Sequence, residues 1–325
     1  MKQIQFSEPG TPHEVARCVD VPAPGQPGVG EVLVRVIAFP INPADLLTMQ
    51  GVYPRPGNGS ATVGTEAVGI VVALGSGVEQ LREGDRVIVL ETGNWTEFKR
   101  VAASKVLKVS AAGDTLQQAM LKVNPGTASL LLSSIALTGG DWILQSAANS
   151  AVGGNVIQLA KVLGLKTVNV VRREETVETL TQLGADAVLV DGVDLPERVR
   201  KVVGNGVKFA VDPVGGDTSG RLAECLVEGG TLMVYGGLSS RALSIRPEHL
   251  VFRDIHIRGF WLSRTIERMS YSALTELYDR LGGYLTEGRV HTQVEARYPM
   301  RAIRDALQHA QQTGRSGKIV VEILD

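Results

Sequence analysis

Short apolar runs alternate with helix-forming segments between residues 141 and 263, and this alternation restricts the possible folds more than any other feature of the chain. The expected strands are 141–147, 166–172, 186–191, 207–214, 230–237 and 255–262, and the expected helices are 156–164, 174–184, 195–203 and 220–229. Strands joined by crossovers of a dozen or more residues pair in parallel, and six such strands complete a doubly wound sheet. The sequence therefore predicts an α/β fold with a parallel central sheet.

The regions on either side of this alternation are expected to form a domain of a different kind. Short β-type runs separated by turns rich in glycine and proline are typical of a small barrel or sandwich, and here they are 31–39, 67–75 and 85–91. The strand-like C-terminal run, 317–324, is expected to return to this domain. The predicted domains are thus 1–120 together with 264–325, and 121–263.

Length and charge restrict the class of protein. A chain of 325 residues can bury two cores, and 44% hydrophobic with 21% charged residues is ordinary globular composition. The net charge of −1 argues against a surface for nucleic acid or anionic membrane, which needs a basic excess. No apolar run approaches the roughly 20 residues of a membrane span, and "MKQIQFSEPG" lacks the apolar centre of a secretion signal. We expect no nucleic-acid partner, no membrane association and a cytoplasmic location.

The cysteines and histidines show no metal-ligand spacing. Cys18 and Cys225 stand far apart and form no CxxC pair, and the five histidines lie in separate segments. We therefore expect no metal site.

The stretch "SAANSAVGG" (146–154) joins an expected strand to an expected helix and is a candidate phosphate-binding turn. Free backbone N–H groups and the helix dipole hold phosphate at such a junction. Asn149 and Ala151 stand where a dinucleotide fingerprint usually carries glycine. Asparagine tolerates a left-handed backbone, and Asn149 and Ser150 can donate hydrogen bonds to phosphate. A plain strand-to-helix turn is the alternative interpretation.

A basic pair at the end of the second expected strand favours a cofactor that carries an extra phosphate. Arg172 and Arg173 lie nineteen and twenty positions after Gly153, where an acidic residue would otherwise meet a free ribose 2′-hydroxyl. Guanidinium groups pair well with a 2′-phosphate, and arginine is unfavourable at a helix N-terminus. The alternative is a solvated helix start that happens to be basic. We predict NADPH as the cofactor.

Three further segments are expected beside the cofactor. "YGGLSS" (235–240) follows the fifth expected strand, where backbone lines the crevice of doubly wound folds. "GFWLS" (259–263) ends the sixth, and core packing is the alternative for its two aromatic residues. "NPGTA" (124–128) places Asn124 and Thr127 at a break in a helical region, within reach of a nicotinamide amide.

The segment "INPADLLTMQGVYP" (41–54) of the first domain combines Asn42, Asp45 and Tyr53. A loop tyrosine with a pKa of about 10 can donate a hydrogen bond or a proton to a carbonyl that gains negative charge. Tyr53 is therefore the candidate proton donor, and an ordinary surface tyrosine is the alternative.

Together these features resemble the medium-chain dehydrogenase/reductase superfamily over essentially the whole chain. The general marks are "GTEAVGIVVALGSGV" and "GDRV" in the first half and the loop at 146–154. The resemblance implies a GroES-like β-barrel catalytic domain, completed by the C-terminus, and a central Rossmann domain. Zinc-dependent members carry a cysteine ligand and a Gly-His-Glu motif. Here "FPINPAD" and "GTE" correspond, with Thr65 in place of histidine, so the resemblance implies no catalytic zinc.

Within that superfamily the chain looks most like the NADPH-dependent 2-enoyl thioester reductases of the mitochondrial type. The strings that carry the likeness are "NPADLLTMQGVY", "VNPGTA", "ANSAVGGNVIQLAKVLGLKTVNVVR", "YGG" and "RGFWLS". The resemblance implies that Tyr53 is the proton donor. The implied cofactor contacts are Asn124, Asn149, Ser150, Ala151, Val152, Arg172, Arg173, Tyr235, Gly236, Gly237, Leu238, Phe260, Trp261, Leu262 and Lys318.

The expected reaction is reduction of the carbon–carbon double bond of a 2-enoyl thioester or related activated alkene, with hydride added at the β-carbon and a proton at the α-carbon. The acyl group would be carried by CoA or by acyl carrier protein, in fatty acid metabolism, and the resemblance implies a homodimer formed through the sixth strand. One rival is a zinc-free quinone or enone oxidoreductase. A rival from another class is a non-catalytic sensor that binds NADPH.

Overall fold

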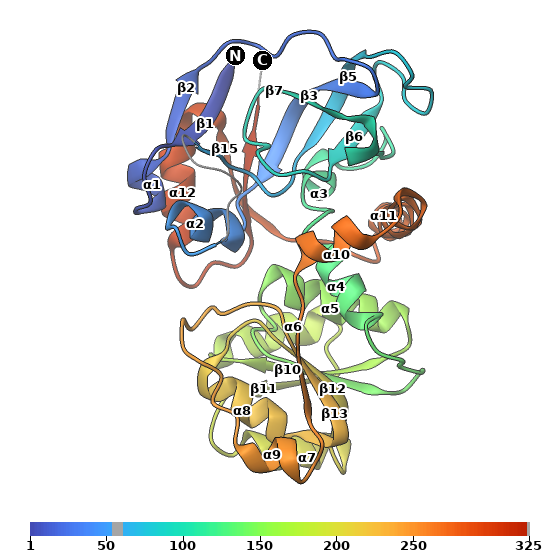
Figure 1. The fold of residues 1–325 in the computed structure, drawn as a ribbon. Coiled ribbons are helices and arrows are strands. Elements are labelled where there is room, and N and C mark those ends of the chain that lie inside the picture. Colours follow the sequence, from blue (N-terminus) through green and yellow to red (C-terminus); the bar gives the residue numbers. More distant parts are fainter. Residues whose placement is uncertain (54–60, 324–325) are drawn as a thin grey trace. The chain divides into compact units, whose positions relative to one another are not determined.

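Two units make up the computed structural model, which describes residues 1–53 and 61–323 of the chain (Figure 1). Unit 1 comprises Met1–Val123 and Ser270–Asp325, and unit 2 comprises Asn124–Met269. Among the described residues, no helix combines the length and the apolar character needed to cross a membrane.

Unit 2, whose residues are all described, contains one six-stranded parallel sheet in the order β11-β10-β9-β12-β13-β14 (Figure 1). Its strands are β9 (Trp142–Gln145), β10 (Lys166–Val171), β11 (Ala187–Val190), β12 (Val207–Asp212), β13 (Leu226–Val234) and β14 (His256–Gly259). The strand order reverses between β9 and β12, which is the topological switch point of a doubly wound sheet. The predicted parallel α/β fold is therefore confirmed.

Helices follow most of these strands. They are α4 (Asn124–Leu132), α5 (Ala151–Val162), α6 (Val177–Leu183), α7 (Leu195–Val203), α8 (Gly216–Glu224), α9 (Pro247–Val251) and α10 (Leu262–Arg268), with a 3-10 turn at Glu174–Thr176. On α7, Leu195 and Val199 are one turn apart and both are buried against the sheet core. Helix α6 ends at Gly184, whose φ of 110° is readily adopted by glycine.

Some expected boundaries differ in the structure. The helix expected at 220–229 ends at Glu224, and residues 226–229 belong to β13, which therefore starts four residues before the expected 230. The sixth strand ends at Gly259 rather than at 262, because α10 begins at Leu262. Asn124 and Thr127 do not lie in a helix break, because α4 begins at Asn124. Proline fits the first turn of a helix, where its missing N–H has no partner to lose, so the Asn-Pro-Gly sequence starts a helix here.

Unit 1 is a β-domain with sheets at its centre. Among its described residues, one sheet has the path β15-β16-β3-β5-β6-β8, with β7 paired to β3, and a smaller sheet has the order β2-β1-β4. The strands are β1 (Lys2–Phe6), β2 (Arg17–Asp20), β3 (Glu31–Pro40), β4 (Ala61–Thr62), β5 (Val68–Leu74), β6 (Arg86–Val89), β7 (Phe98–Ala102), β8 (Val106–Lys108), β15 (Val294–Pro299) and β16 (Lys318–Glu322). Because β16 pairs antiparallel with β3, the C-terminal strand completes this domain as the fold prediction stated.

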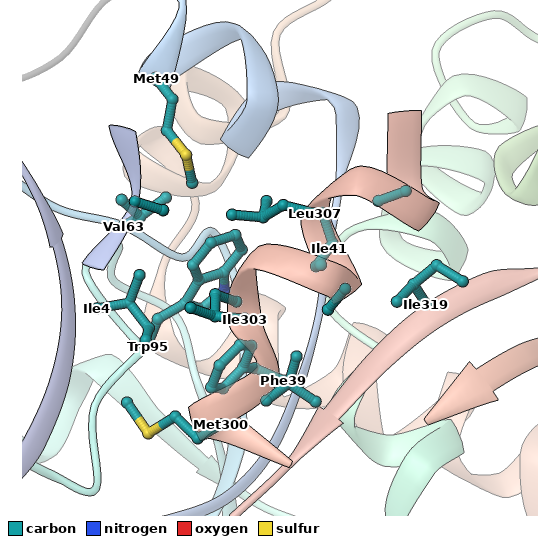
Figure 2. Packing of buried hydrophobic residues seen from close by; sticks show 14 of the residues in the cluster. Ile4, Phe39, Ile41, Met49, Val63, Trp95, Met300, Ile303, Leu307 and Ile319 are labelled. Atoms are coloured by element: carbon teal, nitrogen blue, oxygen red, sulfur yellow. The ribbon is translucent and has the colours of Figure 1, made fainter. Parts of the chain in front are cut away.

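Unit 1 also contains helices. They are α1 (Pro12–Val15), α2 (Pro43–Met49), α3 (Thr115–Ala119), α11 (Tyr271–Thr286) and α12 (Ile303–Gln311), with 3-10 turns at Ala103–Lys105 and Met300–Ala302. Of these, α3 and α12 pack against strands of the two sheets. Figure 2 shows an apolar core of unit 1, in which Trp95 stacks on Phe39 with ring centroids 5.2 Å apart. Met49 of α2 and Leu307 of α12 pack into the same cluster, so α2 is anchored at its last residue by apolar burial.

Candidate functional site

The predicted cofactor segments of unit 2 lie along one edge of its sheet. They are 146–152 after β9, 172–173 after β10, 235–238 after β13 and 260–262 after β14. Because the strands are parallel, their carboxyl ends meet at the same edge. Backbone bonds join neighbouring segments there, since Ser146 N donates to Val211 O (3.1 Å) and Tyr235 N to Asp212 O (3.0 Å). Asn124 and Thr127 are on α4, which packs against α5.

The loop between β9 and α5 is a tight turn with a defined backbone. Ala147 has a φ of 47°, so this alanine takes the left-handed conformation that asparagine at position 149 would also have tolerated. Ala148 N donates to Val170 O at 3.2 Å, which holds the turn against β10. The Ser150 hydroxyl accepts from Gly153 N at 3.1 Å and caps α5. The first N–H groups of α5 have no acceptor within the helix and are therefore available to an anion.

Gly153 is required by the close approach of α5 to this loop. A Cβ at this position would lie 2.4 Å from the Ala148 carbonyl oxygen, whereas a Cβ on Gly154 would meet only the Leu183 side chain, at 3.4 Å. The Gly153 carbonyl also accepts a hydrogen bond from the Gln145 side chain of β9 (3.0 Å). Gly153 thus allows the close approach of α5 to the loop after β9, and Gly154 plays no such part.

The Asp212 carboxylate organises the switch point, and sequence reasoning missed it. Asp212 is fully buried and accepts hydrogen bonds from the hydroxyls of Ser146 and Ser219 and from the backbone N–H groups of Val214 and Gly215. It therefore joins the loop after β9 to the loop after β12. The available signal was an aspartate directly after a buried strand in "FAVDPVGG".

The basic pair predicted to bind the 2′-phosphate follows β10 directly. Arg172 and Arg173 are both exposed, and neither guanidinium forms an ion pair or hydrogen bond with any residue of 1–53 or 61–323. Guanidinium groups without a protein partner are suited to a ligand phosphate. This arrangement fits the 2′-phosphate of NADPH.

Two buried polar atoms near the same edge lack partners, counting only the described residues. The Asn124 side chain is 3% exposed and its Nδ2 donates no hydrogen bond. The Tyr235 hydroxyl is buried near Ser150 without a hydrogen bond of ordinary geometry. A buried donor without an acceptor is costly, and a ligand that offers an acceptor would satisfy it. The Asn124 amide therefore fits the carboxamide of a nicotinamide ring.

The aromatic pair after β14 is not fully buried. Trp261 is 42% exposed and Phe260 is half-buried. For Trp261 this exposure favours a role at the surface over the core-packing alternative. Leu238, after β13, is also exposed.

In unit 1, Tyr53 follows α2 and is held by its backbone. Its N–H donates to the Leu47 carbonyl at 3.1 Å, and Val52 N donates to the same oxygen at 2.9 Å. Gly51, with a φ of 74°, makes the turn between α2 and this residue. The tyrosine side chain is half-buried.

A cluster of buried polar side chains lies at the start of α2, and sequence reasoning identified it only in part. We call it the Asn42 cluster; it comprises Asn42, Asp45, Thr65, Glu66, Lys122 and Lys318. The Lys318 ammonium, implied above as a cofactor contact, here donates to the Ile41 carbonyl (2.8 Å) and to Asn42 Oδ1 (2.5 Å). The residues come from distant parts of the sequence, so their proximity had no local signal.

Burial controls the charges of the Asn42 cluster. It raises the pKa of Asp45 to about 6, against the opposing hydrogen bonds from Asn42 N and Thr65 N and the charge of Lys318. Burial likewise raises the pKa of Glu66 and lowers that of Lys318 to about 8. Two carboxyl groups and two amines are therefore buried together, so that each charge has an opposite charge nearby.

The Thr65 side chain stands where zinc-dependent members of the resembled superfamily carry histidine. Its hydroxyl accepts a hydrogen bond from Asn42 Nδ2 at 3.1 Å. Across residues 1–53 and 61–323, no three His, Cys, Asp or Glu side chains are grouped so as to hold a metal ion.

Comparison with known proteins gives matches over both units. A family model described as "Zinc-binding dehydrogenase" matches residues 151–280, and one described as "Alcohol dehydrogenase GroES-like domain" matches residues 28–119. The mitochondrial enoyl-[acyl-carrier-protein] reductase of Caenorhabditis elegans is 38% identical over 300 residues, which cover 90% of this chain and 86% of the relative. The protein of the same name from Dictyostelium discoideum is 36% identical over 303 residues, with the same two coverages.

Solved structures of similar proteins match the whole chain. An NADPH:quinone reductase of Bacillus thuringiensis has a TM-score of 0.91 at 27% identity and covers 99% of both chains. Escherichia coli quinone oxidoreductase, solved with NADPH, has a TM-score of 0.89 at 26% identity, covering 99% of this chain and 100% of its own.

The expected cytoplasmic location is wrong in the light of the two enoyl reductases. The Caenorhabditis elegans and Dictyostelium discoideum proteins are both named as mitochondrial, which points to a mitochondrial rather than a cytoplasmic location. The expectation failed because the sequence features on which it rested do not distinguish the cytosol from the interior of an organelle.

Proposed function

The chain belongs to the medium-chain dehydrogenase/reductase superfamily and, within it, to the enoyl reductases of the mitochondrial type; on that premise we propose that it reduces the carbon–carbon double bond of 2-enoyl thioesters with NADPH. The observation that carries the proposal is identity above 35% to two enoyl reductases over 90% of the chain. Their names state an acyl-carrier-protein thioester as the substrate, and we extend the thioester class to this chain.

Unit 2 supplies the cofactor site of the proposal. Arg172 and Arg173 bind the 2′-phosphate, the loop 149–152 at the start of α5 binds the pyrophosphate, and Asn124 with Thr127 binds the nicotinamide amide. The segments 235–238 and 260–262 line the same sheet edge. When bound, NADPH supplies a hydride to the β-carbon of the substrate.

Unit 1 supplies the proton. Tyr53 donates it from its phenolic oxygen to the α-carbon, on which the electron pair of the double bond is left after hydride addition. Lys318 remains a proposed contact of the cofactor. Its hydrogen bonds to Ile41 and Asn42 support a contact that acts on the cofactor indirectly, through these residues.

The proposed functional division follows the expected domains. Residues 1–120 with 264–325 form the catalytic domain, and 121–263 form the NADPH-binding domain. The proposal is supported by the boundaries between unit 1 and unit 2, at Val123/Asn124 and Met269/Ser270, which lie within a few residues of the expected domain boundaries.

We also propose a homodimer, and acyl carrier protein as a carrier of the substrate in fatty acid metabolism. The dimer would form through β14, because this strand ends the sheet of unit 2 and its outer backbone groups can pair with a second copy. The carrier is supported by the names of the two relatives.

A quinone or enone reductase is the second candidate, because two structural matches above 25% identity carry quinone-reductase names. No observation favours a non-catalytic sensor. The test is NADPH oxidation by the purified protein with crotonyl-CoA, a small quinone or a simple enone as acceptor. We expect crotonyl-CoA to give the highest kcat/KM, with Tyr53→Phe lowering its kcat severely. Oxidation with the quinone alone would overturn the proposal in favour of the second candidate.

A further inference from the structure

Asn42 is a buried neutral residue between two groups of opposite charge. Its side chain is 1% exposed, with Oδ1 accepting from the Lys318 ammonium (2.5 Å) and Nδ2 donating to Glu66 Oε1 (2.8 Å). Its backbone N–H donates to Asp45 Oδ2 at 2.8 Å. The residue therefore connects strand β16, which carries Lys318, with the segment that carries Glu66.

The groups around Asn42 are themselves held in place. Glu66 Oε2 accepts from the backbone N–H of Val123 at 2.8 Å, so both oxygens of this carboxylate are used. Gly64 has a φ of 117°, and a Cβ there would lie 2.4 Å from the ring of Trp95, which fixes the turn that precedes Glu66. Asn42 thus bonds to a rigid frame.

Asn42 is also the residue from which α2 starts. This helix has seven residues, of which Asp45 and Met49 are buried, and Leu46 packs partly buried against the apolar core, so its apolar contacts lie in its second half. Met49 holds its last turn in the apolar core (Figure 2), and the Asn42 cluster holds its first turn. Removing the polar attachment leaves α2 fixed at one end.

The direction of α2 sets the position of Tyr53. The Leu47 carbonyl of α2 accepts the backbone N–H groups of Val52 and Tyr53, so a change in the helix is passed on to the tyrosine. Leu47 lies two residues before Met49, the end of α2 that stays fixed, which is about 3 Å along the helix. A tilt of about 10° therefore moves Leu47 by roughly 0.5 Å, and since a misplacement of about 1 Å at a reacting group can lower a rate by about 100-fold, this displacement should cost about 10-fold.

We propose that Asn42 is a positioning residue for proton transfer by Tyr53, acting through its bonds to Lys318 and Glu66 and through α2. The inference rests on the proposed function, because it assigns Asn42 a role in the step that Tyr53 performs. It concerns the orientation of the donor and not the binding of the cofactor.

The test is a double-mutant cycle of Asn42→Ala and Tyr53→Phe, measured as NADPH oxidation with crotonyl-CoA. In the wild-type background we expect Asn42→Ala to lower kcat by about 10-fold while the KM for NADPH changes by less than about twofold. In the Tyr53→Phe background the same substitution should lower kcat by less than about twofold, because the hydroxyl that it positions is already gone. An equal loss of kcat in both backgrounds would overturn the proposal.

Gln117→Ala is the matched control for lost stability. Gln117 is a buried amide of unit 1, on α3, whose side chain exchanges two hydrogen bonds with the Thr292 backbone. We expect this variant to lose stability but keep the wild-type kcat. If Asn42→Ala loses stability and keeps its kcat in the same way, its role is structural only and the inference is wrong. Glu66→Gln keeps the shape of the side chain. Like Asn42→Ala it should lower kcat in the wild-type background and not in the Tyr53→Phe background, but by a smaller factor.

A measurement without substrate separates this inference from the proposed function. Hydrogen exchange of residues 43–53 should accelerate at least tenfold in Asn42→Ala and stay unchanged in Gln117→Ala, because the bonds from Val52 and Tyr53 to Leu47 open more often. Unchanged exchange would overturn the positioning role. A wild-type protein that is inactive with crotonyl-CoA but shows this exchange pattern would overturn only the proposed reaction.

Discussion

The Asn42 cluster of unit 1 and the cofactor edge of unit 2 use charge in opposite ways. In the Asn42 cluster the charged groups are buried and each has partners, as when Lys318 bonds to Asn42 and faces Glu66. At the cofactor edge, Arg172 and Arg173 are exposed and have no partner among the described residues. A buried charge must be paired, which fixes its surroundings, whereas an exposed guanidinium can be paired by a ligand. The comparison teaches that burial fixes the partners of a charge within the protein, whereas the exposed basic pair of unit 2 stays available to a ligand.

Lys318→Met gives the largest expected effect, because it leaves Glu66 and Asp45 without one of their compensating charges. Breaking a buried pair in this way costs about 3–5 kcal/mol, which should appear as a lower midpoint in urea unfolding of the whole chain. The control is Lys208→Met, which removes an exposed ion pair to Asp141 (3.1 Å) in unit 2 and should cost less than about 1 kcal/mol. Equal losses would show that the cluster is not a buried charge network.

The double variant Arg172→Ala, Arg173→Ala tests whether the exposed basic pair at the cofactor edge binds the 2′-phosphate. We expect NADPH affinity to fall about 100-fold, since charge-assisted hydrogen bonds to the 2′-phosphate are lost. NADH affinity and the unfolding free energy should change little because both side chains are exposed. Fluorescence titration with both nucleotides is the measurement, and equal weakening of NADPH and NADH would contradict recognition of the 2′-phosphate.

Gly153→Ala tests how far cofactor binding at this edge depends on the backbone shape of the loop rather than on charge. The new Cβ would lie 2.4 Å from the Ala148 carbonyl oxygen, so the loop must move at a cost of about 1–3 kcal/mol. Both the unfolding free energy and NADPH affinity should fall. Gly154→Ala is the matched control and should leave both nearly unchanged, since its Cβ meets only Leu183.

The ion pair of Asp191 with Arg221 is an intermediate case in unit 2, because both side chains are largely but not fully buried. Burial raises the pKa of Asp191, but the hydrogen bonds from Arg221 and Thr218 outweigh it, and the net pKa lies below its ordinary value. The pair therefore stabilises the fold above the pKa of about 3.9 that aspartate has in unfolded chains, and this contribution is lost as the pH falls through the native pKa.

Asp191→Asn should accordingly cost about 1–2 kcal/mol at pH 7, and the difference from wild type should shrink as the pH is lowered below about 4. Urea unfolding at several pH values is the measurement. A difference that does not depend on pH would show that hydrogen-bond geometry, and not the charge of Asp191, stabilises this contact.

Much of unit 2 was predictable because its signals are local. The apolar runs that became β9 to β14 are read from consecutive residues, and the Arg172–Arg173 pair is recognisable from its distance to Gly153 alone. The backbone details were not predictable. The left-handed residue is Ala147 rather than Asn149, since the bonds of the neighbouring loop to β10 and β12 decide the turn.

The sequence by itself determined the parallel sheet, the barrel-like partner domain, the tight turn between β9 and α5 and the place of the basic pair after β10, because each depends on residues close together in the chain. Only the tertiary structure decided that Asp212 joins two loops and that Asn42, Glu66 and Lys318 meet in one cluster. The physical reason is the separation between the partners: Asn42 and Lys318 are 276 positions apart, and they meet only because β16 pairs with β3. Such a contact has no signature in local sequence pattern.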